Sequence, residues 1–222
     1  LATSEGAKIT IEPWDYRFYA EKVRKAKYDL DSEEVKPYLQ LDKLREAMFY
    51  VAGELFGFGF APVPEGTLPV FHPGVKVWEV TDKASGKHVG YWYLDPYARQ
   101  GKRSGAWASS YRSHSTFDGP ETVLSSNNSN FVKPAPGEPL LISFDDAETF
   151  FHEFGHLPHN IFAGHQRWVR ISGISTEWDF VEAPSQMLEE WAWRYDTLIL
   201  FARHFETREP ISKELVGKML SA

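Results

Sequence analysis

The segment His152-Glu153-Phe154-Gly155-His156 holds the residues of this chain that are best suited to chemistry. On an α-helix, side chains four residues apart differ by about 40° around the axis and by about 6 Å along it, so His152 and His156 can bind one metal ion together. Zn²⁺ prefers neutral imidazole nitrogen and keeps one position open at catalytic sites. Glu153 leaves the helix in a different direction and can accept the proton of the attacking water. The segment therefore predicts a zinc hydrolase.

The alternative is a chance pair of histidines on a helix face, because such pairs also occur without a metal. The glutamate between them makes the zinc interpretation more specific. Gly155 points the same way, since glycine inside a helix costs about 1 kcal/mol relative to alanine. We therefore expect another segment to approach the helix backbone closely at Gly155.

A third protein ligand must come from elsewhere in the chain. The sequence has no cysteine, which excludes thiolate ligands and disulfides. Metzincins would have a third histidine six positions after His156, but Phe162 stands there. A carboxylate from a following helix is the other arrangement. Spacing alone leaves five candidates open: Glu177, Asp179, Glu182, Glu189 and Glu190.

The elements that must position these residues are mostly helical. Leu41, Leu44 and Met48 recur at intervals of three and four, which is typical of an amphipathic helix. Asp145 is predicted to cap the helix that carries the motif, and Glu148 completes a capping box. The predicted helices cover residues 13–30, 40–56, about 146 onward, about 180–205 and about 212–221.

Short apolar segments predict a small sheet. Residues 75–80 alternate between apolar and polar, and residues 89–94 follow a turn as their antiparallel partner. Residues 140–144 read as a further buried strand. Residues 95–136 are rich in Gly, Ser, Asn and Pro and are expected to form a long loop. The expected fold class is α+β, predominantly helical, with a small antiparallel sheet, in a single domain over residues 1–222.

Composition and charge exclude several classes of protein. The net charge of −7 argues against a nucleic-acid binder, because phosphate contacts need clustered Lys and Arg. Aromatic residues make up 15% of the sequence, which argues against disorder. No apolar run reaches the roughly 18 residues needed to cross a membrane. No signal peptide is recognisable, and the cytoplasm is the expected location.

Two segments together resemble the thimet oligopeptidase and peptidyl-dipeptidase family of zinc peptidases. They are residues 151–156, which contain the motif, and residues 179–189. The resemblance extends over essentially residues 13–195 and is strongest to the dipeptidyl carboxypeptidase and oligopeptidase A branch. Shorter similarities lie at residues 21–24, 94–99, 101–103 and 134–137.

The resemblance implies a role for each site residue. His152, His156 and Glu182 would bind one Zn²⁺ per chain, and Glu153 would be the catalytic base. Glu189 lies on the same face of the second helix as Glu182 and is a candidate for orienting a ligand histidine. An exposed or salt-bridged carboxylate is an equal alternative for Glu189.

The implied reaction is zinc-dependent hydrolysis of peptide bonds in short peptides, by an oligopeptidase or a peptidyl-dipeptidase. Family members are much longer, and the later Gly- and Tyr-rich segment with which they bind substrate has no counterpart here. We therefore expect a catalytic-core fragment with weak activity by itself, because losing an oxyanion donor is costly. Missing segments or a second chain would cover apolar surface around residues 180–205. The alternative is a zinc- and peptide-binding fragment with little or no catalytic activity.

Overall fold

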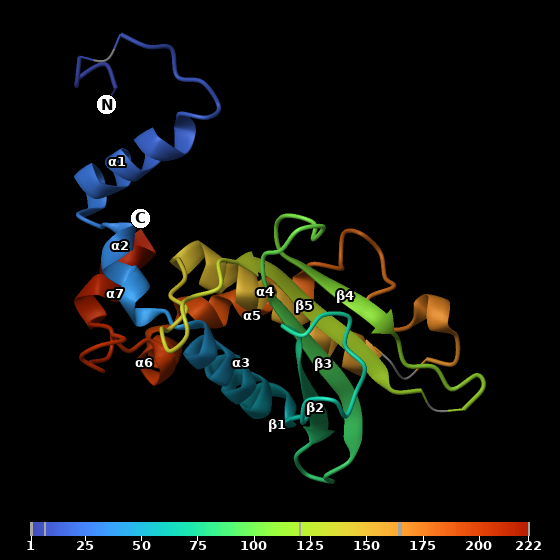
Figure 1. Cartoon of the computed structure of the whole chain (residues 1–222). Coiled ribbons are helices and arrows are strands. Elements are labelled where there is room, and N and C mark those ends of the chain that lie inside the picture. Colours follow the sequence, from blue (N-terminus) through green and yellow to red (C-terminus); the bar gives the residue numbers. More distant parts are fainter. Residues whose placement is uncertain (1, 7, 120, 164–165, 222) are drawn as a thin grey trace.

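The computed structural model describes residues 2–6, 8–119, 121–163 and 166–221. Its helices are α1 (Tyr16–Tyr28), α2 (Ser32–Val35), α3 (Leu41–Phe56), α4 (Phe144–Phe162), α5 (Ala183–Trp193), α6 (Tyr195–Phe201) and α7 (Lys213–Ser221). Its strands are β1 (Phe58–Pro62), β2 (Lys76–Asp82), β3 (His88–Tyr97), β4 (Trp107–Arg112) and β5 (Val123–Phe131). The α3 and α4 helices pack against the sheet, whereas α1 extends away from this body (Figure 1). The predicted α+β class is confirmed.

The five strands form one mixed sheet in the order β1-β2-β3-β5-β4. The predicted antiparallel pairing of β2 with β3 is confirmed, and it places Trp78 opposite Trp92. In contrast, β3 and β5 run parallel, so the prediction of an antiparallel sheet is wrong. The β4 strand pairs with β5 and lies at one end of this strand order. Both β4 and β5 lie within residues 95–136, which were expected to form a loop.

The β5 strand escaped prediction because its buried side chains are polar. Residues 125–129 are all buried. The indole N–H of Trp92 donates to Asn127 Oδ1 over 2.6 Å, and Asn160 of α4 donates to Ser125 Oγ over 2.5 Å. These hydrogen bonds tie polar side chains of β5 into the core, although Asn127 Nδ2 and Asn160 Oδ1 are buried without a partner among the described residues. A strand of this kind has no apolar alternation to reveal it.

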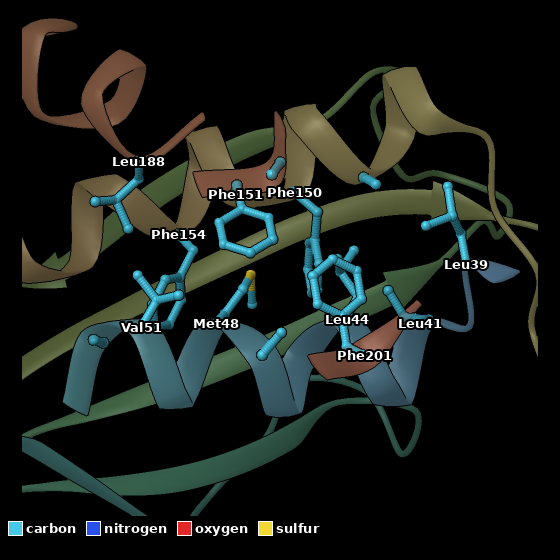
Figure 2. Close-up of a cluster of buried hydrophobic side chains, with 14 of the residues drawn as sticks. Leu39, Leu41, Leu44, Met48, Val51, Phe150, Phe151, Phe154, Leu188 and Phe201 are labelled. Carbon is cyan, nitrogen blue, oxygen red and sulfur yellow. The ribbon is translucent and has the colours of Figure 1, made fainter. Parts of the chain in front are cut away.

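The main core lies between α3 and α4 (Figure 2). Leu44 and Met48 of α3 meet Phe150, Phe151 and Phe154 of α4, and all five side chains are at most 1% exposed. Burying one such side chain contributes about 1.5–3 kcal/mol. This packing fixes the helix that carries both histidines.

The α4 helix begins earlier than predicted and is capped by Ser143. The Asp146 N–H donates to Ser143 Oγ over 3.1 Å, and the Asp146 carboxylate accepts from the Ser143 N–H over 3.3 Å. The prediction of Asp145 as the cap is therefore wrong. A serine followed three residues later by aspartate forms the capping box two positions upstream.

Two other predicted elements differ in the structure. The single helix predicted over residues 180–205 is divided, because Arg194 has an extended backbone with ψ of 126° between α5 and α6. The strand predicted over residues 140–144 makes only an isolated bridge between Leu141 and Gln40. The α3 helix begins directly after Gln40 and α4 begins three residues after Leu141, so the chain turns into helices instead of extending the bridge into a ladder.

Apolar side chains are exposed on and beside α5 and α6, as predicted for residues 180–205. Phe180 is 53% exposed, Met187 48% and Leu200 51%. In the part of the chain that the structure describes, no helix combines the length and the apolar character needed to cross a membrane.

Candidate metal centre

Three side chains converge where α4 faces the beginning of α5. His152 and His156 project from successive turns of α4, and Glu182 lies one residue before α5 as its N-cap rather than within the helix. The Nε2 atoms of His152 and His156 lie 3.1 and 3.4 Å from Glu182 Oε2. Tetrahedral zinc with bonds of about 2.0–2.1 Å places its ligand atoms about 3.3 Å apart. The donor atoms therefore fit a single Zn²⁺ ion.

The geometry distinguishes Glu182 from the other carboxylates considered. Within the described ranges, His152, His156 and Glu182 are the one group of three or more possible ligands whose atoms all lie within 4.8 Å of one another. The side chains of the other exposed candidates belong to no such group; these are Glu177, Asp179 and Glu190. Glu182 is therefore the carboxylate best placed to complete the site.

Glu189 contacts the outer nitrogen of one histidine. Its Oε1 lies 2.5 Å from Nδ1 of His152. An imidazole that offers Nε2 to a metal carries its proton on Nδ1, so His152 would donate to Glu189. Glu148 is a further carboxylate near Glu189, and burial together with the charge of Glu189 raises its pKa. It accepts a hydrogen bond of 2.5 Å from the Trp193 indole. Sequence reasoning gave Glu148 and Trp193 no part in the site.

Glu153 is nearly buried beside the histidines, with 9% of its surface exposed. Burial raises the pKa of its carboxyl above the ordinary value, whereas the charge of His152 and a hydrogen bond from the Ala108 N–H lower it. A carboxylate with a raised pKa is a better proton acceptor near neutral pH. Ala108 belongs to β4, so a strand that the sequence did not predict positions the predicted base.

Burial also favours the form of His156 that binds metals. It lowers the pKa of the imidazole below its ordinary value of 6.5, and the ring therefore stays neutral over a wider pH range. One turn later, Asn160 attaches α4 to the sheet. Its Nδ2 donates to Ser110 Oγ of β4 over 3.1 Å and to Ser125 Oγ of β5 over 2.5 Å. The histidine thus lies on a turn of α4 that is fixed to the sheet.

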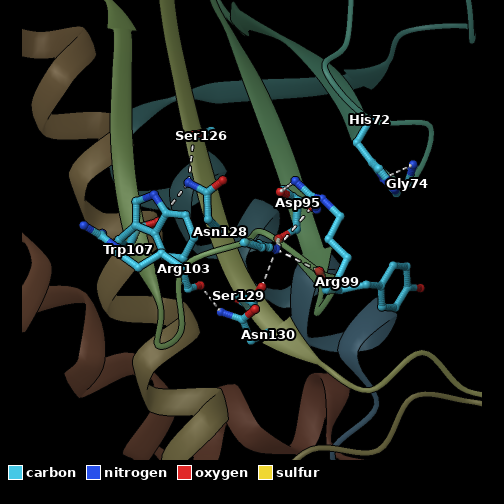
Figure 3. A network of polar contacts seen from close by, with 12 residues as sticks. His72, Gly74, Asp95, Arg99, Arg103, Trp107, Ser126, Asn128, Ser129 and Asn130 are labelled. Carbon is cyan, nitrogen blue, oxygen red and sulfur yellow. Dashed lines mark hydrogen bonds and ion pairs between the residues drawn. The ribbon is translucent and has the colours of Figure 1, made fainter.

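A buried polar network holds the loop that leads into β4 (Figure 3). Arg99 donates two hydrogen bonds, of 2.6 and 2.9 Å, to the Asp95 carboxylate. The ammonium group of Lys102 donates to the carbonyl oxygens of Asp95 and Tyr97 over 2.8 and 2.9 Å, and also to that of Ser129. The Lys102 side chain is only 2% exposed, and burial lowers its pKa. The network therefore fixes the start of β4 relative to β3 and β5.

Gly155 allows α5 to approach α4. A Cβ atom at this position would lie 2.6 Å from Cα of Ser185 and 3.0 Å from the carbonyl oxygen of Pro184. The close approach predicted at this glycine is therefore confirmed. The approaching segment is the first turn of α5, directly after Glu182.

Comparison with known proteins places this geometry in context. The model of Peptidase family M3 matches residues 1–222. The chain is 43% identical over 215 residues to the dipeptidyl carboxypeptidase of Escherichia coli (strain K12), which covers 96% of this chain and 31% of the relative. It is 36% identical over 237 residues to two proteins of Arabidopsis thaliana, an organellar oligopeptidase A, chloroplastic/mitochondrial, and a probable cytosolic oligopeptidase A. Those matches cover 100% of this chain and 29% and 32% of the relatives. The chain therefore spans about a third of the length of these relatives.

Proposed function

This chain belongs to Peptidase family M3, and we propose on that premise that it is the zinc-binding core of a metallopeptidase that hydrolyses peptide bonds in short peptides. The observation that carries the proposal is the spacing of the donor atoms: Nε2 of His152 and of His156 lie 3.1 and 3.4 Å from Glu182 Oε2. The relatives are named as a dipeptidyl carboxypeptidase and as oligopeptidases. We accordingly propose two modes of cleavage for this chain, the removal of C-terminal dipeptides and cleavage inside the peptide.

His152, His156 and Glu182 would hold one Zn²⁺ per chain, and water or substrate would take the remaining position. When bound, zinc supplies a Lewis acid that polarises the scissile carbonyl and makes the attacking water more acidic. Glu189 would accept a hydrogen bond from the Nδ1–H of His152, which keeps the proton on Nδ1 and leaves Nε2 free for the metal.

Glu153 performs the proton transfers in this proposal. Its carboxylate takes a proton from the water whose oxygen attacks the peptide carbon. It returns that proton to the amide nitrogen as the carbon–nitrogen bond breaks, which releases an amine and a carboxylic acid that then loses its proton to water. Burial supports this role, because it raises the pKa of Glu153 and strengthens it as a base. The Ala108 N–H fixes the direction of the carboxylate.

The proposal is tested by measuring zinc content and peptide hydrolysis on the same preparation. We expect about one zinc per chain, loss of that zinc in His152→Ala and in His156→Ala, and hydrolysis of a quenched fluorescent short peptide. Wild-type zinc affinity in both histidine variants would overturn the metal site. Zinc binding without hydrolysis would instead favour the alternative, a zinc- and peptide-binding fragment.

A cytoplasmic location stays a prediction, since the two plant relatives are named for different compartments. Coverage of the apolar surface beside α5 by further segments or by a second chain likewise stays a prediction.

A further inference from the structure

Ser185 occupies an unusual position for a serine. It lies in the first turn of α5 and is 0% exposed, whereas serine is a mostly exposed residue type. Its hydroxyl lies 2.8 Å from Oε2 of Glu182 and 2.9 Å from the Glu182 backbone oxygen. Oε2 is the same atom that lies 3.1 Å from His152 Nε2 and 3.4 Å from His156 Nε2. The hydroxyl is therefore directed at the oxygen that faces both histidines.

Apart from the two histidines, Ser185 supplies the side-chain contact that the described part of the chain gives to the Glu182 carboxylate. Glu182 is the N-cap residue of α5 but makes no side-chain capping hydrogen bond, and its side chain is 48% exposed. Fixing a long, flexible side chain costs rotamer entropy whenever a metal binds to it. A neighbouring donor that orients the carboxylate beforehand reduces this cost and so raises metal affinity.

We propose that Ser185 is a positioning residue for the zinc ligand Glu182, as Glu189 is for His152. The inference rests on the proposed function, in which Glu182 binds zinc. An ionised carboxylate only accepts hydrogen bonds, so the Ser185 hydroxyl donates to it in a charge-assisted bond. Removing a partner of a metal ligand typically weakens metal affinity by about 10–100-fold. Ser185→Ala is expected to weaken zinc binding to the same extent.

The placement of Ser185 depends on Gly155. Because Gly155 has no Cβ, the Ser185 backbone lies directly against α4, one residue before His156. The hydroxyl is thus fixed by backbone packing and not by a mobile side chain. Serine has only one rotatable bond before its oxygen, so few rotamers have to be excluded to hold the hydroxyl against Glu182.

A purely structural role is the competing explanation. The hydroxyl also contacts the Glu182 carbonyl oxygen, and that bond would stabilise the beginning of α5 without any effect on the metal. The two roles differ in one respect. Only the positioning role makes the effect of Ser185 on zinc affinity depend on the Glu182 carboxylate.

A double-mutant cycle in the full chain separates these roles. Zinc dissociation constants are measured by competition with a chromophoric chelator for wild type, Ser185→Ala, Glu182→Ala and the double variant, and melting temperatures are measured without metal. Ser172→Ala is the matched control, because Ser172 is also 0% exposed and donates to a backbone oxygen, that of His114, over 2.6 Å. Ser185→Gly also removes the hydroxyl without adding a zinc ligand, and it replaces the alanine variant if that variant does not fold.

Zinc affinity should fall by about 10–100-fold for Ser185→Ala in the wild-type background and by less than about 3-fold when Glu182 is already alanine. Ser172→Ala should change only the melting temperature. If Ser185→Ala weakened zinc affinity equally in both backgrounds, or in neither, the positioning role of Ser185 would be overturned while the proposed site would stand. An unchanged affinity in Glu182→Ala would instead overturn Glu182 as a ligand, and with it the proposed site.

Discussion

Replacing Gly155 with alanine sets helix propensity against the packing of α5 on α4. Alanine is normally the better residue inside a helix, by about 1 kcal/mol. At this position, however, the new Cβ would lie 2.6 Å from Cα of Ser185. Carbon atoms in favourable contact are about 3.5–4.0 Å apart, so the two helices would have to separate by about 1 Å.

The consequences for stability and for zinc binding differ in size. Overpacking of a well-packed core costs about 1–3 kcal/mol, and the gain in helix propensity offsets part of it. The free energy of unfolding should therefore fall by about 0–2 kcal/mol. Zinc tolerates ligand distances only within about 0.2 Å, and a displacement of about 1 Å at Glu182 exceeds this. We expect Gly155→Ala to weaken zinc binding by at least about 10-fold.

Urea unfolding of the metal-free chain and chelator competition for zinc measure both effects. Gly217→Ala is the control, because Gly217 lies within α7 and an added Cβ there meets no atom within 4 Å. That variant should gain about 0.5–1 kcal/mol and bind zinc as wild type does. If Gly155→Ala gained as much stability as the control and kept wild-type zinc affinity, the reasoning about helix packing would be refuted.

Four further predictions concern Glu182, Glu153 and Lys102. Glu182→Gln should lose both zinc affinity and hydrolysis, whereas Glu177→Gln should keep both. The reverse result would show that Glu182 is not the third ligand. Burial raises the pKa of the Glu153 carboxyl in the metal-free chain, whereas the charge of a bound zinc ion would lower it; Glu153→Gln should therefore lose an acidic limb of kcat/KM that wild type shows, and an identical limb in both would exclude Glu153 as the base. The same shift implies a contribution to stability that is present at low pH and lost as the pH rises through the raised pKa, measurable by urea unfolding of metal-free Glu153→Gln against wild type. Lys102→Met removes the donor to three carbonyl oxygens and leaves the buried Asp95 carboxylate still paired with Arg99, so it should lower the free energy of unfolding by about 1–3 kcal/mol, whereas a loss below about 0.5 kcal/mol would show that Lys102 contributes little.

The sequence was most informative where apolar periodicity coincided with structure. The α3 helix lies within one residue of its predicted start, because Leu44 and Met48 recur at helical spacing and point into the core. The close contact at Gly155 was predictable for a related reason, since glycine is unfavourable inside a helix unless a neighbour requires it.

Other parts of the site leave no such trace. The β5 strand buries serines and asparagines whose hydrogen-bond partners lie far away in sequence, and hydropathy does not detect them. Ala108 contributes a backbone N–H, which every residue except proline possesses. Ser185 acquires its importance from burial against Gly155, a relation between two helices that spacing within one helix does not encode.

The most direct test of the central claim compares Glu153→Gln with wild type for zinc content and for hydrolysis of a quenched fluorescent short peptide. Glutamine keeps the size of the side chain but is not a base, and Glu153 lies beside the proposed ligands without belonging to their group. The variant should keep about one zinc per chain and lose about 10²–10⁴ in turnover. Turnover equal to that of wild type in the zinc-loaded variant would contradict the account.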